Sequence, residues 1–307
     1  MSNVLTEKQI DSYRESGFLV VEGLFEDELV ERARRTVDRL LSGPDLGAVA
    51  ETEPGDPTVA RRIWAPTSRD EVFGRIAEYP RLLDTVADLI GENLVLQYSK
   101  LNVKAPRVGS VVQWHQDFAF YPHSNIDLVA ALIYLDDATP ENACLRVAAG
   151  SHRLGLLNHE VDGYFAGKIA SLPAVGVPES TVVDCPGKAG TVVFLHPLVA
   201  HASELNHSDR YRRAFIPAYR ASDALPLYYG PHASHNEPTA KLVRGKASKT
   251  ARTEGGTWRL PLAAAEFNSL FEIQEGAHLA SSGRKAATGY FAGEAAEDPS
   301  ALAAAVM

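Results

Sequence analysis

The segment Leu94–Lys104 (LVLQYSKLNVK) decides the fold class, because it is long, rich in β-branched and aromatic residues, and followed by further runs of the same kind. These runs are short and are separated by Gly, Pro, Asp and Asn. They read SVVQWHQDF (110–118), LVAALIYLDD (128–137), CLRVAAG (144–150), TVVFLHP (191–197) and RAFIPAYR (213–220). No helical pattern separates them, so antiparallel pairing is favoured over a doubly wound parallel sheet. The sequence therefore predicts a mainly β protein with a jelly-roll core.

The regions on either side of this core differ from it in predicted secondary structure. Residues 1–93 are predicted to be mostly helical, with a helix over 7–15 capped by Thr6, a longer helix over 25–41, and helical patterns near 69–77 and 80–90. A short strand is expected at 18–21 and a surface loop at 42–58. After the core (94–220), residues 221–307 form an extension of a length typical of active-site lids. We expect a single domain over 1–307.

Composition restricts the partners. The formal net charge is -9 and no long basic run is present, so nucleic acid is not expected to bind. The polar N-terminus lacks a secretory pattern and no apolar stretch reaches the length of a membrane span, which predicts a cytoplasmic protein that does not bind membranes. The two cysteines, Cys144 and Cys185, are expected to be buried free thiols. Oligomeric state cannot be read from the sequence.

The tetrapeptide Trp114-His115-Gln116-Asp117 is the first candidate for chemistry. Side chains at i and i+2 of a strand point to the same face, so His115 and Asp117 can reach a single metal ion. Taken alone, a His-x-Asp pair is weak evidence, because many such pairs lie on protein surfaces.

A third ligand is expected from GTVVFLHPLVAHAS (190–203), which offers His196 and His201. His196 stands before a proline at a strand end, where a packed histidine is the more usual role, so His201 is the better candidate. Two histidines and one carboxylate leave positions open on the metal, which suits Fe(II) with O2 and a chelating co-substrate. Zinc fits less well, because a closed structural zinc site needs a fourth protein ligand.

Arginines downstream of His201 suggest a co-substrate site. Arg210, Arg212 and Arg213 lie in or next to a strand-like run, and alternation predicts that some of them are solvated. One buried guanidinium near the metal is enough to hold the distal carboxylate of a dicarboxylic acid through a bidentate pair.

With these motifs in order, the chain resembles the phytanoyl-CoA dioxygenase family of Fe(II)/2-oxoglutarate oxygenases. The resemblance runs through LTEKQIDSYRESGFLVVEGLF (5–25), YSKLNVK (98–104), VVQWHQDFAFYPHSN (111–125), IYLDDATPENACLRVAAGSH (133–152) and HPLVAHASELNHSDRYRRA (196–214). Small departures occur at Ala149, where many relatives carry proline, and at Ala143 and Cys144, where Gly-Ala is usual.

The resemblance implies a double-stranded β-helix with flanking helices and a specific site. It implies that His115, Asp117 and His201 hold Fe(II), and that Arg212, Ser203 and, less specifically, Asn102 bind 2-oxoglutarate. O2 would be the second co-substrate and succinate and CO2 the products. Because Asp117 keeps the carboxylate that related halogenases lack, hydroxylation, desaturation or cyclisation is expected rather than halogenation.

The substrate is not identified by the resemblance. We expect a small organic molecule, such as a secondary-metabolite intermediate, that is hydroxylated. Two alternatives stay open at this point. A redox-neutral lyase, isomerase or hydrolase would keep the metal site without needing Arg212, and a non-catalytic binding module would keep only the fold. In the segment 151–152, His152 is expected to pack at a strand end rather than act as a base.

Overall fold

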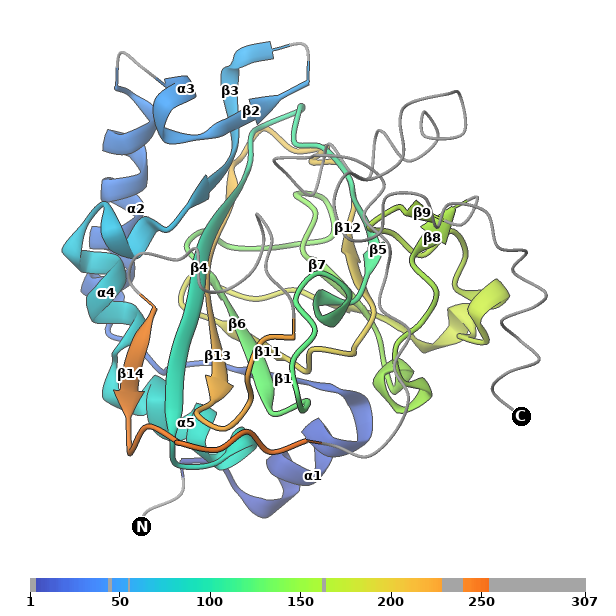
Figure 1. The fold of residues 1–307 in the computed structure, drawn as a ribbon. Coiled ribbons are helices and arrows are strands. Elements are labelled where there is room, and N and C mark those ends of the chain that lie inside the picture. Colours follow the sequence, from blue (N-terminus) through green and yellow to red (C-terminus); the bar gives the residue numbers. More distant parts are fainter. Residues whose placement is uncertain (1–3, 44–45, 55, 162–163, 228–239, 254–307) are drawn as a thin grey trace.

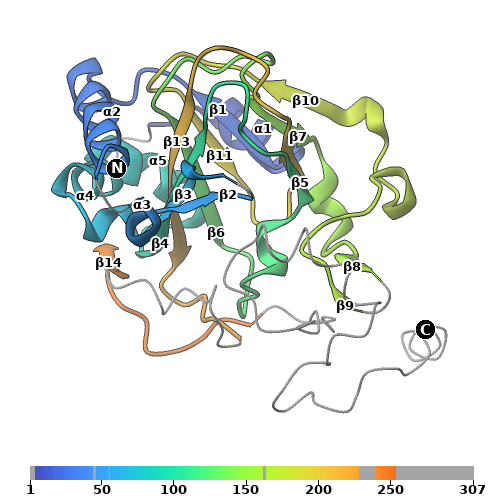
Figure 2. The same ribbon diagram turned by 90° about the horizontal axis from the view of Figure 1, so that it is seen from above.

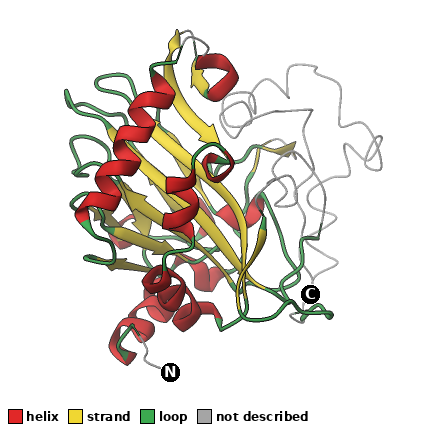
Figure 3. Cartoon of the chain, turned by 90° about the vertical axis from the view of Figure 1, so that its left-hand side faces the viewer, coloured by secondary structure: helices red, strands yellow, loops and turns green. Residues whose placement is uncertain are grey.

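The computed structural model describes residues 4–43, 46–54, 56–161, 164–227 and 240–253 (Figure 1). Two antiparallel sheets face each other in this part of the chain, and helices cover the outer face of the larger sheet (Figure 3). The prediction of a mainly β core with flanking helices is confirmed.

The strands of the larger sheet come from the whole length of the described chain. They are β1 (Phe18–Val21), β2 (Glu51–Glu53), β3 (Asp56–Trp64), β4 (Leu94–Lys104), β6 (Leu128–Tyr134), β11 (Val192–Leu195), β13 (Arg212–Ala221) and β14 (Lys241–Arg244). The strands of the smaller sheet are β5 (Val112–His115), β7 (Leu145–Ala148), β10 (Val182–Cys185) and β12 (His201–Ser203). A separate pair consists of β8 (Glu160–Val161) and β9 (Tyr164–Phe165).

Among the described residues the larger sheet has eight strands in the order β1-β11-β6-β13-β4-β3-β2, with β14 also paired to β4. The smaller sheet has the order β10-β7-β12-β5. Strands that are distant in sequence are therefore neighbours, as in the pairing of β13 with both β4 and β6. Seen from above, β5, β7 and β10 lie on the opposite side from α2, α3 and α4, with β4, β6 and β13 between them (Figure 2).

The α-helices of the described chain follow the sequence prediction, except for one short helix in the stretch predicted as a loop. They are α1 (Glu7–Ser16), α2 (Asp27–Leu41), α3 (Leu46–Val49), α4 (Glu71–Ala77) and α5 (Pro80–Ile90). Helix α1 begins with a capping box, in which the Thr6 side chain accepts from the backbone N–H of Gln9 and the Gln9 side chain accepts from the N–H of Thr6. It ends at Gly17, whose φ of 80° favours glycine.

The loop predicted over 42–58 is wrong in part. This stretch contains α3, β2 and the start of β3, and β2 pairs with β3 while β3 pairs with β4. The polar, Pro- and Gly-containing composition hides these strands, because their pairing depends on partners distant in sequence rather than on local propensity.

Two apolar cores occupy the two sides of the larger sheet. Leu101 and Val103 of β4 pack with the helices on its outer face. Tyr98 of the same strand packs between the two sheets. Lys100 and Asn102 alternate with the outward residues and line a cavity between the sheets. The polar residues at inward positions of β4 therefore show where the apolar core between the sheets ends and the cavity begins.

The described part of the C-terminal extension is attached to the domain by ion pairs. Lys241 pairs with Glu78, and Arg244 pairs with Asp84 and Glu92. The segment 228–239 and residues 254–307, to which a lid function was assigned, lie outside the described residues.

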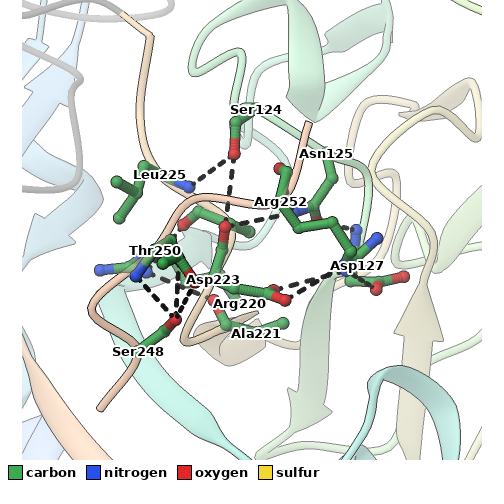
Figure 4. A network of polar contacts seen from close by, with 11 residues as sticks. Ser124, Asn125, Asp127, Arg220, Ala221, Asp223, Leu225, Ser248, Thr250 and Arg252 are labelled. Atoms are coloured by element: carbon green, nitrogen blue, oxygen red, sulfur yellow. Dashed lines mark hydrogen bonds and ion pairs between the residues drawn. The ribbon is translucent and has the colours of Figure 1, made fainter. Parts of the chain in front are cut away.

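Arg252, near the end of the described part of the extension, also binds to the domain (Figure 4). Its guanidinium pairs with Asp127 and Asp223, and its backbone carbonyl accepts a hydrogen bond from the Asn125 side chain at 3.0 Å. The extension therefore contacts the chain segment that follows Asp117. No helix in the described residues combines the length and apolar character needed to cross a membrane.

Candidate active site

Three buried side chains meet between the sheets. His115 ends β5, His201 begins β12, and these two residues are directly paired across the strands, with ring centroids 4.2 Å apart. Asp117 follows in a 3-10 turn, η2 (Asp117–Ala119), and its Oδ1 lies 3.9 Å from His115 Nε2. One ligand atom from each of the three residues lies within 4.8 Å of the others. The predicted triad is therefore assembled, although Asp117 stands just after the strand rather than in it.

Both imidazoles are oriented by backbone carbonyls. His115 Nδ1 lies 2.8 Å from the carbonyl oxygen of Gln113, and His201 Nδ1 lies 3.1 Å from that of Val199. A carbonyl only accepts, so Nδ1 carries the proton and Nε2 offers a lone pair to a metal. Burial lowers the pKa of both histidines, which keeps the rings neutral.

The charge of Asp117 is stabilised by its neighbours. Burial alone would raise its pKa, but Lys100 and the two histidines outweigh burial and hold the pKa well below its usual range. Lys100 Nζ lies 3.7 Å from Asp117 Oδ1. A hydrogen bond with Tyr121 lowers the pKa further, and the Tyr121 hydroxyl lies 2.7 Å from that of Tyr98. Asp117 is thus a carboxylate, the form that binds a metal.

Gln116, which lies between His115 and Asp117 in the chain, stabilises the backbone that carries them. Its side chain is fully buried, donates to the carbonyls of Gly155 (2.9 Å) and Leu198 (2.5 Å), and accepts from the N–H of Leu157 at 2.7 Å. Its backbone N–H donates to His159 Nε2 at 2.9 Å. These contacts fix the turn that carries Asp117.

The residues predicted to bind the co-substrate line the same cavity as the triad. The cavity contains Arg212, Ser203 and Asn102, together with Arg62, Lys100 and several aliphatic side chains. Arg212 and Ser203 are each 3% exposed, so neither is a surface group. Arg212 Nε donates to the carbonyl of Ala143 at 3.0 Å. Ala143 has a φ of 66°, a backbone conformation that favours glycine.

The three arginines of this region have separate environments. Arg212 and Arg213 are neighbours on β13 and point to opposite faces. Arg212 faces the cavity, whereas Arg213 forms ion pairs with Asp136 (2.6 Å) and Asp38. Arg210 does not line the cavity. The choice of Arg212 as the inward arginine therefore agrees with the geometry.

Two cavity residues were missed from the sequence. Arg62 of β3 is 1% exposed and its Nε donates to Asn102 Oδ1 at 3.0 Å. No signal predicted it, because β3 itself was not expected. Lys100 could have been found, since period-two alternation places it on the same face as Asn102.

The two other histidines considered from the sequence, His196 and His152, lie outside the cavity. His196 accepts from the N–H of Leu198 at Nδ1 (3.1 Å) and packs against His152, with ring centroids 4.9 Å apart. His152 Nε2 lies 3.0 Å from the carbonyl oxygen of Arg14 in α1. Neither histidine lines the cavity, so His201 is the third member of the triad. Cys144 and Cys185 are buried free thiols, as predicted.

The donor set fits iron with a co-substrate. Two neutral imidazoles and one ionised carboxylate, all buried, supply a facial triad and leave further positions on the metal for exogenous ligands. Arg212 supplies a buried cation in the same cavity, as a dicarboxylic acid requires.

Comparisons with known proteins agree with this chemistry. The family model for phytanoyl-CoA dioxygenase (PhyH) matches residues 13–214. A probable alpha-ketoglutarate-dependent hypophosphite dioxygenase of Stutzerimonas stutzeri is 30% identical over 247 residues, which are 74% of this chain and 84% of the relative. An L-proline trans-4-hydroxylase of Streptomyces griseoviridis is 27% identical over 242 residues, 70% of this chain and 87% of the relative. Among solved structures, EctD from S. alaskensis with bound Fe aligns with a TM-score of 0.65 at 23% identity, covering 81% of this chain and 90% of EctD.

The double sheet and the buried triad define a non-haem iron enzyme of the 2-oxoglutarate-dependent dioxygenase class, built on a double-stranded β-helix. Within that class, the chain belongs to the phytanoyl-CoA dioxygenase (PhyH) family. Iron and 2-oxoglutarate are its cofactors. The redox-neutral enzyme and the non-catalytic binding module are therefore set aside.

Proposed function

We propose that this dioxygenase hydroxylates a small organic molecule and releases succinate and CO2. The observation that carries the proposal is the presence of the triad and Arg212 in one buried cavity. A relative named as an L-proline trans-4-hydroxylase supports hydroxylation of a small molecule. A secondary-metabolite intermediate stays our prediction for the substrate.

The triad residues would hold Fe(II), and Arg212, Ser203 and Asn102 would bind 2-oxoglutarate. Arg212 offers a guanidinium for the distal carboxylate, and the Ser203 hydroxyl is a further donor. The Arg62 hydrogen bond to Asn102 Oδ1 leaves the Asn102 amide NH2 to donate into the cavity. When bound, the iron and 2-oxoglutarate supply the O2-dependent oxidation of a C–H bond.

The protein's own contribution is positioning and exclusion of water. The carbonyls of Gln113 and Val199 fix the imidazole tautomers, and Gln116 fixes the turn of Asp117. Aliphatic cavity walls such as Leu132, Leu195 and Ile216 keep the reacting centre dry. The chain would act as one oxygenase domain over 1–307, with the cytoplasm as its predicted location.

The proposal is tested by adding 2-oxoglutarate anaerobically to the Fe(II)-loaded protein and recording the weak visible charge-transfer band of the chelate. We expect the band in the wild type and its loss in His201→Ala. Succinate release in air, dependent on iron, completes the test. Absence of the band despite confirmed iron binding would contradict the proposal.

A further inference from the structure

The cavity contains a cation, Lys100, whose carboxylate partner among the described residues, Asp117, is itself a predicted metal ligand. Lys100 projects from β4 into the cavity, with its side chain 10% exposed and its Nζ 3.7 Å from Asp117 Oδ1. Its ammonium also lies 5.5 Å from the centre of the Tyr98 ring. A buried lysine beside a metal ligand is costly, because it repels the cation that the carboxylate must bind.

Lys104, the other buried lysine of β4, has a structural role and serves as a comparison for Lys100. Its Nζ donates to the backbone carbonyls of Ser110 and, at 2.6 Å, of Glu204. Lys100 has no such pair of carbonyl acceptors among the described residues, and Asp117 is the carboxylate that supports its charge. Backbone hydrogen bonds therefore account for the charge of Lys104, whereas the charge of Lys100 depends on a carboxylate that the metal also needs.

The charge balance of the cavity changes when the cofactors bind. Arg62 has Glu51 opposite it across β2 and β3, which supports its charge. The dication and the dianionic co-substrate cancel each other, so Asp117 is the one anion among the described cavity residues left to balance two cations, Arg212 and Lys100. Once the metal holds Asp117, Lys100 has no free counter-charge among the described residues.

Lys100 and Arg212 also occupy different levels of the β-helix. In the register of β4 with β13, Lys100 lies opposite Ile216 whereas Arg212 lies opposite Lys104. Four residues of strand, roughly 13 Å, separate these two levels along β4. Lys100 is at the level of Asp117, where a substrate must approach the metal, and Arg212 is displaced toward the far end of the strand.

We infer that Lys100 binds an oxyanion of the substrate, a carboxylate or a phosphorus oxyanion, next to the metal. This inference rests on the proposed function and names the substrate class. A bound oxyanion supplies the counter-charge that Asp117 no longer gives, and the compact ammonium suits it as a point-charge donor. The Lys100 contact then sets which carbon or phosphorus atom faces the metal.

The test titrates the anaerobic Fe(II) and 2-oxoglutarate complex with three probes: hypophosphite, propionate and neutral propionamide. We expect an anion to shift the visible band and propionamide to leave it unchanged. Lys100→Met should raise the dissociation constant of the anion by roughly 10- to 100-fold, the effect of losing a charged hydrogen bond. Lys100→Arg should restore binding to within about threefold, since it keeps a cation at the same position. Lys241→Met, the same change at an exposed position on β14, should match the wild type.

The outcomes separate this inference from the proposed function. A response to hypophosphite alone supports a phosphorus oxyanion, and a response to propionate alone supports a carboxylate. A normal band that neither anion shifts overturns the inference only. If Lys100→Met weakens 2-oxoglutarate and leaves the anion probes unchanged, Lys100 belongs to the co-substrate site and the inference fails. If no band forms at all, the proposed function fails and this inference with it.

Discussion

The two sheets contribute different chemistry to the same cavity. The smaller sheet and the turn after it carry the metal ligands, with His115 and His201 directly paired across β5 and β12. The larger sheet carries the cations, with Arg62, Lys100 and Arg212 on the neighbouring strands β3, β4 and β13. We therefore expect metal binding to depend on the pairing of β5 with β12, and the proposed anion binding to depend on inward residues of β3, β4 and β13. Variants on each sheet should fail in different ways.

The largest expected effect is on the smaller sheet. Asp117→Ala removes the only carboxylate of the triad, so iron binding and iron-dependent turnover should fall by more than the roughly 10- to 100-fold typical of losing an outer-shell partner. Far-ultraviolet circular dichroism should show the fold retained. Asp184→Ala on β10, where the aspartate is partly exposed and pairs with Arg146, is the matched control. Wild-type turnover in Asp117→Ala would remove the carboxylate from the site.

The larger sheet is tested by the adjacent arginines of β13. Arg212→Met should weaken 2-oxoglutarate by about 100-fold, as expected for truncating a buried charge pair, and leave iron affinity unchanged. Arg213→Met should leave 2-oxoglutarate affinity unchanged. It should lower the free energy of unfolding by about 3 kcal/mol, because Asp136 loses the guanidinium that neutralises it.

These two variants are measured by anaerobic titration of the visible band and by urea denaturation. The comparison of the two faces of β13 fails if Arg213→Met is the variant that loses 2-oxoglutarate. It also fails if both variants lose it equally.

The contribution of Gln116 to the turn that carries Asp117 is tested by substitution. Gln116→Leu leaves the carbonyls of Gly155 and Leu198 without their donor, which should cost about 3 kcal/mol of unfolding free energy. Iron affinity should fall by about tenfold as the Asp117 turn loosens. Gln113→Leu, the same substitution at an exposed position on β5, is the control. Equal iron affinity in both variants would show that the turn is held by other contacts.

The sequence predicted the smaller sheet's chemistry better than the larger sheet's. Spacing made His115 and Asp117 candidates, and the strand-like run before His201 supplied the third one. The family resemblance then fixed the choice of all three. Arg212 was chosen through the family resemblance by its spacing from His201, and the structure places it in the same cavity as the triad. Arg62 was out of reach, because β3 reads as a polar segment and becomes a strand only by pairing with β4. Lys100 was overlooked although alternation from Asn102 places it inward.

The connection between the two sheets, residues 196–200, is tested by pH. Burial, with a smaller contribution from His152, lowers the pKa of His196 to about 3. The ring is therefore neutral at pH 7.5, and its Nδ1 accepts the Leu198 N–H. The unfolded chain, with a histidine pKa near 6.5, binds a proton more readily, so this contribution to stability is complete above about pH 6.5 and is lost as the pH falls toward 3. Between pH 7.5 and 5 the loss should be about 2 kcal/mol.

His196→Asn tests this pH dependence, because the asparagine Oδ1 can accept the same N–H without titrating. Urea denaturation at pH 7.5 and pH 5 should show a smaller difference in unfolding free energy for His196→Asn than for the wild type, by up to that amount. Iron binding at pH 7.5 should be unchanged, since His196 does not belong to the triad. An identical pH dependence in the two proteins would mean that the connection tolerates a protonated imidazole, and that the acid sensitivity of the fold arises within the sheets rather than between them.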